Sequence, residues 1–494
     1  MTRVIGLGAL ADVIGPERVI GLPAGEVRGL AYDSRTVQTG TLFFAIPGEH
    51  VDGHDYVGSA VGAGAVAVVV EREIAGLAVP QLLVRRSRDA LADAADAWFG
   101  RPSERLRTIG ITGTDGKTTT GLLATAVLDA GGRKPGLVGT VEMRVGSDRR
   151  PNELRATTPE APELQALLAE MVAAGNDTAV IEATSHGLAQ ARVRNSRFRV
   201  GIVTNLTHEH LDFHGTLEAY RAAKAMLVEE AAIAILNRDD EHFAYFRSRA
   251  GGRVVTYGTA DDADVRATAV DARADGTTFD ARAGSWSGRV ELALAGSFNV
   301  HNALACLALA GVEGIDLDTA SQALASVSSV PGRMERIDEG QPFTVIVDYA
   351  HTPDALQKVL GVLRPMTAGR LAVVFGSAGE RDVAKRPAMG RIAAELADLV
   401  VVTDEDPRLE DRDAINEAIA RGARDAGARD GRDLWVIADR REAIRHAIGL
   451  MRPGDALLLA GKGHEGSIFH GTHKTWWDER EVARQELRAA GRAA

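Results

Sequence analysis

The sequence contains a single cysteine, Cys306, among its 494 residues. One cysteine cannot form a disulfide within the chain, and it cannot build a zinc site ligated by several cysteines. Disulfides are typical of proteins from oxidising compartments and rare in the reducing cytoplasm. We therefore expect a reducing, cytoplasmic location.

Long hydrophobic runs are also missing. A membrane-spanning helix needs about 18 or more consecutive apolar residues. The longest candidate run, over residues 61–70, ends in Glu71-Arg72-Glu73. The first residues soon include Asp12 and Pro16-Glu17-Arg18, so no signal peptide is recognised. The sequence therefore predicts no membrane span.

Positive charge is not in excess. The chain has 57 Lys and Arg against 68 Asp and Glu, which gives a net charge of -11. A general nucleic-acid-binding protein would be basic, so this balance argues against nucleic acid as a partner. Small anionic ligands are not excluded, because local donors rather than net charge bind them.

The length and composition are those of a folded protein with several domains. Apolar residues make up 45% of the chain and charged residues 25%, which excludes a disordered chain. At roughly 100–200 residues per domain, the length predicts about three domains. Two polar, turn-rich junctions lie at residues 99–105 and 330–333. We expect domains over residues 1–100, 101–333 and 334–494.

Short apolar runs alternate with helical patterns along most of the chain, which is typical of an α/β fold with a mainly parallel sheet. Strands are predicted at residues 108–112, 179–183, 201–206, 344–347, 371–375, 399–403 and 456–459. Residues 265–294 predict an antiparallel flap of short strands. In parallel sheets, ligands bind beyond the carboxyl ends of the strands. Four polar side chains fall at or just beyond such ends: Glu182, Asp348, Asp404 and Lys462.

The strongest single motif is a glycine-rich loop between a strand and a helical pattern, Gly113-Thr114-Asp115-Gly116-Lys117-Thr118-Thr119. Backbone N–H groups of such a loop, with the following helix N-terminus, can surround phosphate oxygens. Lys117 would reach the β- and γ-phosphates, and the Thr118 hydroxyl would ligate Mg²⁺. The spacing departs from the usual one, because no glycine stands five residues before Gly116. The alternative is a plain strand–turn–helix junction with a surface lysine.

Two further patterns are weaker. The run at residues 6–11 resembles a dinucleotide-binding fingerprint, but too few residues precede it for a strand, so we interpret it as a turn and a helix start. Residues 204–215 nearly fit a zinc-hydrolase signature, but Phe213 stands where a histidine is required and His214 comes one residue late. Histidines there can equally be structural, and Glu182 can be a helix cap.

Several motifs, in the same order along nearly the whole chain, resemble those of the Mur ligase family. The N-terminal part has Asp33-Ser34-Arg35 and Gly40-x-Leu42-Phe43. The middle part has the glycine-rich loop, Thr157-Thr158-Pro159, Ser185-His186-Gly187-Leu188 with Gln190 and Arg192, and His210-Leu211-Asp212. The C-terminal part has Phe298-Asn299-x-x-Asn302, Asp348-Tyr349-Ala350-His351-Thr352-Pro353, Lys385-Arg386-Pro387 and Gly461-Lys462-Gly463-His464-Glu465. Within the family, the resemblance is to the branch that adds a diamino acid to UDP-N-acetylmuramoyl-L-alanyl-D-glutamate.

The resemblance implies an N-terminal domain for the UDP end of the substrate, a central P-loop-type ATPase and a C-terminal Rossmann-like domain for the incoming amino acid. It implies ATP as co-substrate, Mg²⁺ as cofactor and a role in peptidoglycan precursor synthesis. A substrate carboxylate attacks the γ-phosphate of ATP, and the amine then displaces phosphate from the acyl phosphate. A carboxylate oxygen leaves poorly until it is phosphorylated, and catalysis is then mostly positioning and charge neutralisation. We expect a monomer.

The resemblance also implies roles for individual residues. Contacts to the UDP-linked substrate are expected from Ser34, Thr157, Thr158, Thr184, Gln190 and Arg192. The ATP site is expected to include Gly113, Thr114, Asp115, Gly116, Lys117, Thr118, Thr119, Asn299, Asn302, Arg333 and Asp348. The expected Mg²⁺ ligands are Thr118, Glu182, His210 and a carbamylated Lys224. The incoming amino acid is expected to contact Arg386, Asp404, Asp406, Arg408, Gly461 and Glu465.

Two positions in the middle part of the chain differ from the family's usual residues. Thr184 stands where the relatives usually have serine, so the hydroxyl is kept. Asp115 replaces a commoner asparagine in a loop that works mainly through its backbone.

Three residues are expected to be catalytic: Lys117, Lys224 and His210. By itself, Lys224 would be interpreted as a solvated helix residue, and a bare ammonium beside Mg²⁺ would be repelled. In the Mur ligase family the matching lysine is carbamylated by CO₂, which turns the cation into an anion that can ligate Mg²⁺. The resemblance therefore predicts a carbamate on Lys224.

The identity of the diamino acid depends on the run Asp404-Glu405-Asp406-Pro407-Arg408, where diaminopimelate-adding relatives carry Asp-Asn-Pro-Arg. Arg408 suits the distal carboxylate that diaminopimelate has and lysine lacks, and Glu465 would bind the distal ammonium. Asp406 replaces the asparagine, and its charge favours a purely cationic end, as in lysine or ornithine. We favour diaminopimelate. The other hypotheses are a sister Mur ligase, a folylpolyglutamate-type ligase, a non-catalytic nucleotide-binding regulator and a zinc hydrolase.

Overall fold

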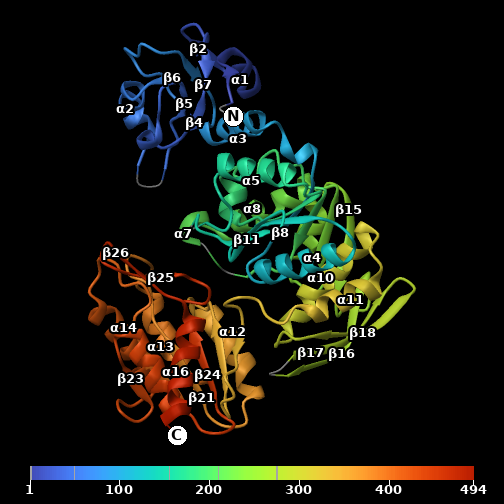
Figure 1. Cartoon of the computed structure of the whole chain (residues 1–494), viewed down its shortest axis with the longest axis vertical. Helices are drawn as coiled ribbons and strands as arrows, with labels where there is room; N and C mark the ends of the chain where they lie inside the picture. The colour runs from blue at the N-terminus through green and yellow to red at the C-terminus, as the bar shows by residue number, and fades with distance from the viewer. Residues whose placement is uncertain are drawn as a thin grey trace. The chain divides into compact units, whose positions relative to one another are not determined.

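The computed structural model describes residues 3–48, 51–154, 156–207, 209, 211–273 and 276–493. Strands and helices alternate along the chain (Figure 1). Contacts divide it into two compact units: the first is residues 1–268, 280–289 and 301–324, and the second is residues 269–279, 290–300 and 325–494. The larger sheets are mainly parallel, which confirms the predicted α/β class. Within the described ranges, no helix has both the length and the apolar character that a bilayer crossing requires.

The N-terminal part of the first unit is a five-stranded sheet in the order β2-β7-β6-β5-β4. Its strands are β2 (Arg18–Ile20), β4 (Gly29–Ala31), β5 (Thr41–Phe44), β6 (Ala65–Val70) and β7 (Gln81–Leu83). Its helices are α1 (Leu7–Ile14), α2 (Val57–Gly62) and α3 (Ser87–Phe99), and a short pair is formed by β1 (Ile5–Gly6) and β3 (Glu26–Val27). The fingerprint-like run at residues 6–11 opens α1, as predicted, and Leu7 and Leu10 from this helix are buried with Leu42 and Trp98.

A second sheet has eleven strands in the order β11-β10-β9-β12-β8-β13-β14-β15-β16-β17-β18. Its strands are β8 (Arg107–Thr112), β9 (Pro135–Val138), β10 (Glu142–Val145), β11 (Asp148–Pro151), β12 (Thr178–Glu182), β13 (Val200–Val203), β14 (Ile233–Asn237), β15 (Arg253–Gly258), β16 (Val265–Arg273), β17 (Gly276–Ala283) and β18 (Trp286–Leu292). In the order of the sheet, the neighbouring strands β9-β12-β8-β13-β14-β15-β16 run parallel. At one edge, β10 is antiparallel to both β9 and β11.

Eight helices accompany these strands along the described part of the chain. They are α4 (Lys117–Ala130), α5 (Ala161–Ala173), α6 (Ser185–Ala189), α7 (Leu211–His214), α8 (Leu217–Glu230), α9 (Phe243–Arg249), α10 (Phe298–Glu313) and α11 (Leu317–Ser326). The central strands β12 and β13 are buried along their whole length, as expected for parallel strands covered on both faces. The strand predicted at residues 201–206 is shorter than expected: β13 ends at Val203, because Thr204 and Asn205 bond to the glycine-rich loop.

The C-terminal sheet belongs to the second unit and has the order β19-β20-β24-β21-β22-β23. Its strands are β19 (Glu335–Ile337), β20 (Thr344–Asp348), β21 (Leu371–Phe375), β22 (Leu399–Val402), β23 (Leu434–Val436) and β24 (Ala456–Ala460). The remaining elements are α12 (Pro353–Met366), α13 (Lys385–Leu396), α14 (Arg412–Asp425), α15 (Arg440–Leu450), α16 (Glu479–Ala493), β25 (Ser467–His470) and β26 (His473–Trp476). In the six-stranded sheet, all neighbouring strands are parallel except β19 and β20, which are antiparallel.

Two separate cores show that helices cover both faces of this sheet. Leu360 of α12, Met389 of α13 and Ile419 of α14 belong to one buried cluster. Ile444 of α15 and Val482 of α16 belong to the other. Alternate residues of one strand enter opposite cores because successive side chains point to opposite faces. This is the doubly wound, Rossmann-like arrangement that we predicted.

Polar residues stand at the carboxyl ends of the parallel strands, as predicted. Glu182 is the last residue of β12 and Asp348 the last of β20, while Asp404 and Lys462 come shortly after β22 and β24. In open α/β sheets this edge is where ligands bind.

Candidate functional site

The glycine-rich loop connects β8 to α4, and Lys117 is the first residue of the helix. Gly116 precedes it with a φ of 82°, a conformation that favours glycine. The first N–H groups of α4 have no partner inside the helix, and they point toward the loop together with the positive end of the helix dipole. Lys117 Nζ donates to the carbonyls of Gly113 (2.9 Å) and Thr114 (2.8 Å), so its ammonium lies over the loop. Such an arrangement can bind phosphate.

Two residues after β13 fix the shape of this loop. Asn205 Oδ1 accepts from the backbone N–H of Asp115 at 2.9 Å, and Thr204 Oγ1 donates to the Asp115 carbonyl at 2.6 Å. A Cβ on Gly113 would lie 1.8 Å from Thr204 Oγ1, so only glycine fits there. Asp115 is thus bonded to Thr204 and Asn205 through its backbone.

Glu182 forms the acidic part of the site and is 1% exposed. Its Oε2 accepts from Thr118 Oγ1 at 2.9 Å and from Thr140 Oγ1 at 2.7 Å, and its Oε1 accepts from the Thr140 N–H at 2.9 Å. Within the described part of the chain, no lysine or arginine forms an ion pair with this carboxylate. A buried carboxylate beside a hydroxyl, without a protein cation, fits Mg²⁺, which prefers oxygen ligands.

Lys224 lies on α8 and is 1% exposed. Its Nζ donates to the Gly113 carbonyl at 2.6 Å and lies 4.5 Å from the centre of the Tyr220 ring. Burial, followed by repulsion from Lys117, lowers the pKa of the Lys224 amine well below its usual value. Lys224 is therefore not the solvated helix residue that its local sequence alone would indicate, because its side chain is buried against the loop.

The remaining predicted metal ligand, His210, lies outside the described residues, as does His208. Among the residues that the structure describes, no group of three or more His, Cys, Asp and Glu side chains is arranged to hold a metal ion. The role of His210 stays a prediction.

The other predicted ATP residues divide between the two units. Asn302 lies on α10, and its Oδ1 is 3.2 Å from Thr120 Oγ1. The same oxygen lies close to Gly116, because a Cβ added to Gly116 would stand 2.5 Å from it. Asn299 Nδ2 donates to the Ala295 carbonyl at 2.8 Å. Asn302 therefore adjoins the loop.

Arg333 and Asp348 belong to the second unit. The Arg333 guanidinium lies 4.7 Å from the centre of the Tyr349 ring. Asp348 accepts from the backbone N–H groups of Met334 and Ala350, each at 2.8 Å. These bonds fix the end of β20 and the segment that carries Arg333.

The threonines predicted to contact the UDP-linked substrate lie next to Glu182. Thr158 Oγ1 is 2.7 Å from the Glu182 carbonyl and 3.1 Å from Thr184 Oγ1. Thr184 caps α6 by accepting from the Gly187 N–H at 3.0 Å. Thr157 Oγ1 lies 3.0 Å from Thr140 Oγ1. These threonines and the acidic site thus form one hydroxyl-lined region.

Arg192 is anchored beside the same threonines. Its Nη1 donates to the Thr158 carbonyl at 2.9 Å, and its Nη2 donates to Gln190 Oε1 at 2.7 Å and lies 2.8 Å from Glu160 Oε1. Arg192 and Gln190 are therefore in direct contact. Ser34 lies apart from them in sequence, in a short 3-10 helix at Ser34–Thr36 that Asp33 caps.

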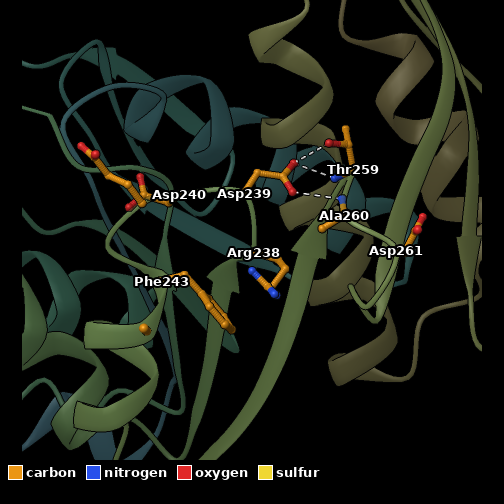
Figure 2. A pocket seen from close by; sticks show the side chains of 9 residues that line it. Arg238, Asp239, Asp240, Phe243, Thr259, Ala260 and Asp261 are labelled. Carbon is orange, nitrogen blue, oxygen red and sulfur yellow. Dashed lines mark hydrogen bonds between the residues drawn. The ribbon is translucent and has the colours of Figure 1, made fainter.

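A wide hollow of about 760 Å³ lies beyond the carboxyl ends of β14 and β15. Figure 2 shows the Asp239 carboxylate turned toward Thr259 and Ala260. Asp239 Oδ2 also lies 2.8 Å from His301 Nε2, one residue before Asn302 on α10. This carboxylate links the loop after β14 to the helix that carries Asn302.

Two of the predicted amino-acid-binding residues, Asp406 and Glu465, meet at Lys462, which is fully buried. Its Nζ lies 3.0 Å from Asp406 Oδ1 and 2.5 Å from Glu465 Oε2. The Phe469 N–H also donates to Asp406 Oδ1 at 3.0 Å, and Tyr349 OH donates to Glu465 Oε1 at 3.3 Å. The negative charge of Asp406 is therefore paired inside the protein.

Arg408 is positioned through its backbone. It adopts a left-handed conformation (φ 54°), its N–H donates to the Phe469 carbonyl at 3.0 Å, and its carbonyl accepts from the Gly471 N–H at 2.7 Å. Among the described residues, no carboxylate forms an ion pair with its guanidinium. That side chain remains available for a ligand carboxylate.

The other three residues of this group are held by different neighbours. Asp404 accepts from Asn416 Nδ2 at 3.0 Å and pairs with Arg412 at 2.5 Å. Arg386 is buried and pairs with Glu410. The Gly461 N–H donates to the Asp348 carbonyl at 3.1 Å.

Sequence reasoning missed several residues that shape these sites. Thr140 follows β9, a strand that the sequence did not predict. Asn205 was placed inside the strand predicted at residues 201–206, whereas it follows β13, which ends at Val203. Polar residues directly after buried strands were the signal that would have identified both. Arg440 and Glu479 lie in ordinary charged runs, and nothing in the sequence distinguishes them from surface residues.

Family models match three stretches of the chain. Residues 26–99 match the Mur ligase family catalytic domain, residues 111–310 the Mur ligase middle domain, and residues 332–463 the Mur ligase glutamate ligase domain. These ranges include the glycine-rich loop, Glu182 and Lys224.

Two curated relatives match almost end to end. The UDP-N-acetylmuramyl-tripeptide synthetase of Roseiflexus sp. (strain RS-1) is 49% identical over 485 residues, which cover 94% of this chain and 95% of that protein. The UDP-N-acetylmuramoyl-L-alanyl-D-glutamate--2,6-diaminopimelate ligase of Geobacillus kaustophilus (strain HTA426) is 42% identical over 475 residues, covering 94% and 96%.

Two solved structures are similar to this chain over most of its length. A structure of a UDP-N-acetylmuramoyl-L-alanyl-D-glutamate--2,6-diaminopimelate ligase has a TM-score of 0.68 and 30% identity, covering 99% of this chain and all of that one. Mycobacterium tuberculosis folylpolyglutamate synthase has a TM-score of 0.62 at 20% identity, covering 81% of this chain and 94% of that one, and shares the fold.

Proposed function

Because the chain belongs to the Mur ligase family, we propose that it is an ATP-dependent ligase of peptidoglycan precursor synthesis. It joins a diamino acid to the D-glutamyl carboxylate of UDP-N-acetylmuramoyl-L-alanyl-D-glutamate, the substrate in the names of its relatives. The observation that carries the proposal is the site itself: a phosphate-type loop under Lys117, with Thr118 and Glu182 2.9 Å apart beside it.

The reaction has two steps. An oxygen of the substrate carboxylate attacks the γ-phosphorus of ATP, ADP leaves, and an acyl phosphate forms. The amine of the diamino acid then attacks the acyl carbon, and phosphate leaves with the oxygen that the acid supplied. The loop N–H groups and Lys117 stabilise the negative charge that spreads over the transferred phosphoryl group.

Thr118 and Glu182 would hold the Mg²⁺ that family members require. When bound, the metal neutralises phosphate charge and orients the phosphoryl group. His210 is proposed as a further ligand on the resemblance alone. Thr140, which donates to both Glu182 oxygens, would keep the carboxylate turned toward Thr118.

The same geometry supports a proposal for substrate binding. Thr157, Thr158 and Thr184 would contact the UDP-linked sugar, and Arg192 would bind its pyrophosphate through donors that Thr158 and Gln190 help to orient. Ser34 is proposed for the uridine end. The proposed domains over residues 1–100, 101–333 and 334–494 would bind the nucleotide-sugar, ATP and the amino acid respectively. A cytoplasmic monomer remains our expectation.

We favour diaminopimelate as the diamino acid. Arg408 has a guanidinium suited to its distal carboxylate, and Glu465 would bind the distal ammonium. The charge of Asp406 argued for lysine or ornithine, but Lys462 pairs with this carboxylate at 3.0 Å. Asp406 therefore does not repel a second carboxylate in the way that an unpaired charge would.

An isotope experiment tests the reaction. With ¹⁸O in the D-glutamyl carboxylate of the substrate, we expect one labelled oxygen in each released phosphate, because the acid supplies the bridging oxygen of the acyl phosphate. Mass analysis of phosphate checks this. Unlabelled phosphate would exclude the acyl phosphate, and nucleotide-sugar binding without ADP release would support the non-catalytic regulator instead.

A competition assay tests the choice of amino acid. Offered diaminopimelate, lysine and ornithine together, the enzyme is expected to incorporate mainly diaminopimelate. Arg408→Ala should lower kcat/KM for diaminopimelate by about 10- to 10²-fold, because a charge-assisted contact is lost. The exposed Arg421 on α14 provides the control, since Arg421→Ala should change nothing. An equal loss of lysine use in the Arg408 variant would contradict a carboxylate clamp.

A further inference from the structure

A buried ion pair links the beginnings of the last two long helices of the second unit. Arg440 is the first residue of α15 and Glu479 the first of α16, and their side chains are 1% and 0% exposed. Arg440 Nε lies 2.9 Å from Glu479 Oε2, and Nη2 lies 2.6 Å from Oε1. Trp477 Nε1 donates to Glu479 Oε2 at 2.6 Å. The guanidinium is thus fixed by two parallel bonds, the strongest geometry available to arginine.

The donors that remain on Arg440 point at two backbone carbonyls. Nη1 donates to the carbonyl of Asp404 at 3.0 Å, and Nη2 donates to the carbonyl of Ala460 at 2.7 Å. Asp404 opens the segment after β22 that leads to Arg408. Ala460 is the last residue of β24 and precedes the segment from Gly461 to Glu465. One side chain therefore contacts both segments that are proposed to bind the incoming amino acid.

No strand ladder joins these two segments directly. In the sheet, β21 lies between β24 and β22, so the carboxyl ends of β24 and β22 are not neighbours. Lys462 and Asp406 connect the segments farther along at 3.0 Å, but through their side chains alone. Arg440 instead bonds to the main chain at the point where each segment leaves its strand.

We propose that Arg440 is a positioning residue that fixes the spacing of the two amino-acid-binding segments. The inference rests on the proposed function, because it assigns those segments to the amino acid. Arg440 itself touches no reacting atom. Glu479 and Trp477 orient its guanidinium from the opposite side, which makes the start of α16 part of the support for the site.

The neighbouring Arg441 offers a matched control. It also joins α15 to α16, through Glu486 at 3.0 Å and Gln485 at 2.9 Å, but it contacts neither segment. Arg440→Met and Arg441→Met therefore each remove one link between the same helices. Only the first also releases the carbonyls of Asp404 and Ala460.

The experiment measures KM separately for the amino acid and for ATP in the full-length enzyme. For Arg440→Met we expect the amino-acid KM to rise by about 10- to 10²-fold, the scale of a misplaced binding group, with the ATP KM within about twofold of normal. Arg440→Lys and Glu479→Gln should show the same selectivity with smaller changes, since a lysine cannot reproduce the planar fork. Arg441→Met should leave both constants unchanged.

Two results would overturn the proposal. One is a fall in kcat alone with an unchanged amino-acid KM, which is what a loss of folded enzyme produces. The other is equal behaviour of Arg440→Met and Arg441→Met. If Arg440→Met does not fold, the lysine and glutamine variants decide by the same criterion. The unaltered enzyme is the reference: if it ligates none of the three diamino acids, the proposed function fails, whereas normal ligation with unselective variants rejects only the role of Arg440.

Discussion

Lys117→Ala is expected to lower the ligation rate by about 10³-fold, the scale of losing a main charge-stabilising group in a preorganised site. The ammonium lies over the loop between the Gly113 and Thr114 carbonyls, at 2.9 and 2.8 Å. Without it, the transferred phosphoryl group would lose its main side-chain cation and would depend on the loop N–H groups and the proposed Mg²⁺. ADP release in the presence of both other substrates is the measurement.

The control for this variant is Lys134→Ala. Lys134 is an exposed lysine just before β9 in the same unit, so its removal changes the net charge equally without touching the loop. It should retain normal turnover. Binding of the UDP-linked substrate to Lys117→Ala, measured by calorimetry, should also stay normal. A Lys117→Ala enzyme with near-normal rates would exclude the proposed role of the loop.

The central site could be predicted in part because its main elements are local in sequence. The apolar run of β8, the glycines and the helical pattern of α4 follow one another directly, and each restricts the backbone in a known way. Glu182 and Asp404 could be located because a buried strand precedes each. The parallel sheet then brings the carboxyl ends of separate strands to one edge.

The contacts that tune the site could not be predicted, because they depend on the order of strands in the sheet. Thr140 meets Glu182 only because β9 lies beside β12, and Asn205 meets the loop only because β13 lies beside β8. The pairing of Arg440 with Glu479 spans 39 residues and two helices. Sequence spacing alone does not encode such distances. The burial of Lys224 also could not be predicted from local sequence, since the helix pattern around it favours a solvated lysine.

Replacement of Lys224 is the other change that we expect to lower turnover strongly, and the surroundings of its amine supply the physical reason. An ammonium that is buried and close to Lys117 is destabilised, so the pKa of the amine falls and the neutral form becomes accessible. A neutral amine can attack CO₂: a C–N bond forms and a proton is released to solvent, leaving a carbamate. The resulting anion would be attracted by Lys117, whereas the ammonium is repelled by it.

Lys224→Ala should therefore lower turnover by on the order of 10²-fold, as expected for the loss of a group that organises a metal site. Short carboxylic acids such as formate or acetate should partly restore activity by occupying the vacated space with an anion. Lys224→Arg should be inactive and not rescued, because a guanidinium stays charged and fills that space. Arg221→Ala is the control, since Arg221 packs over the Tyr245 ring at 4.0 Å and should be dispensable.

The same mechanism fixes the direction of the pH and CO₂ dependence. Since the pKa of Lys224 is lowered, its amine stays neutral to a lower pH than an exposed lysine does, and activity should be lost as the pH falls through that pKa. Added bicarbonate should move this loss to lower pH, because carbamate formation withdraws the neutral amine. Removal of CO₂ should reduce turnover reversibly in the unaltered enzyme and leave the formate-rescued Lys224→Ala enzyme unaffected. A fully active Lys224→Ala enzyme, or turnover indifferent to CO₂ at low pH, would refute the carbamate.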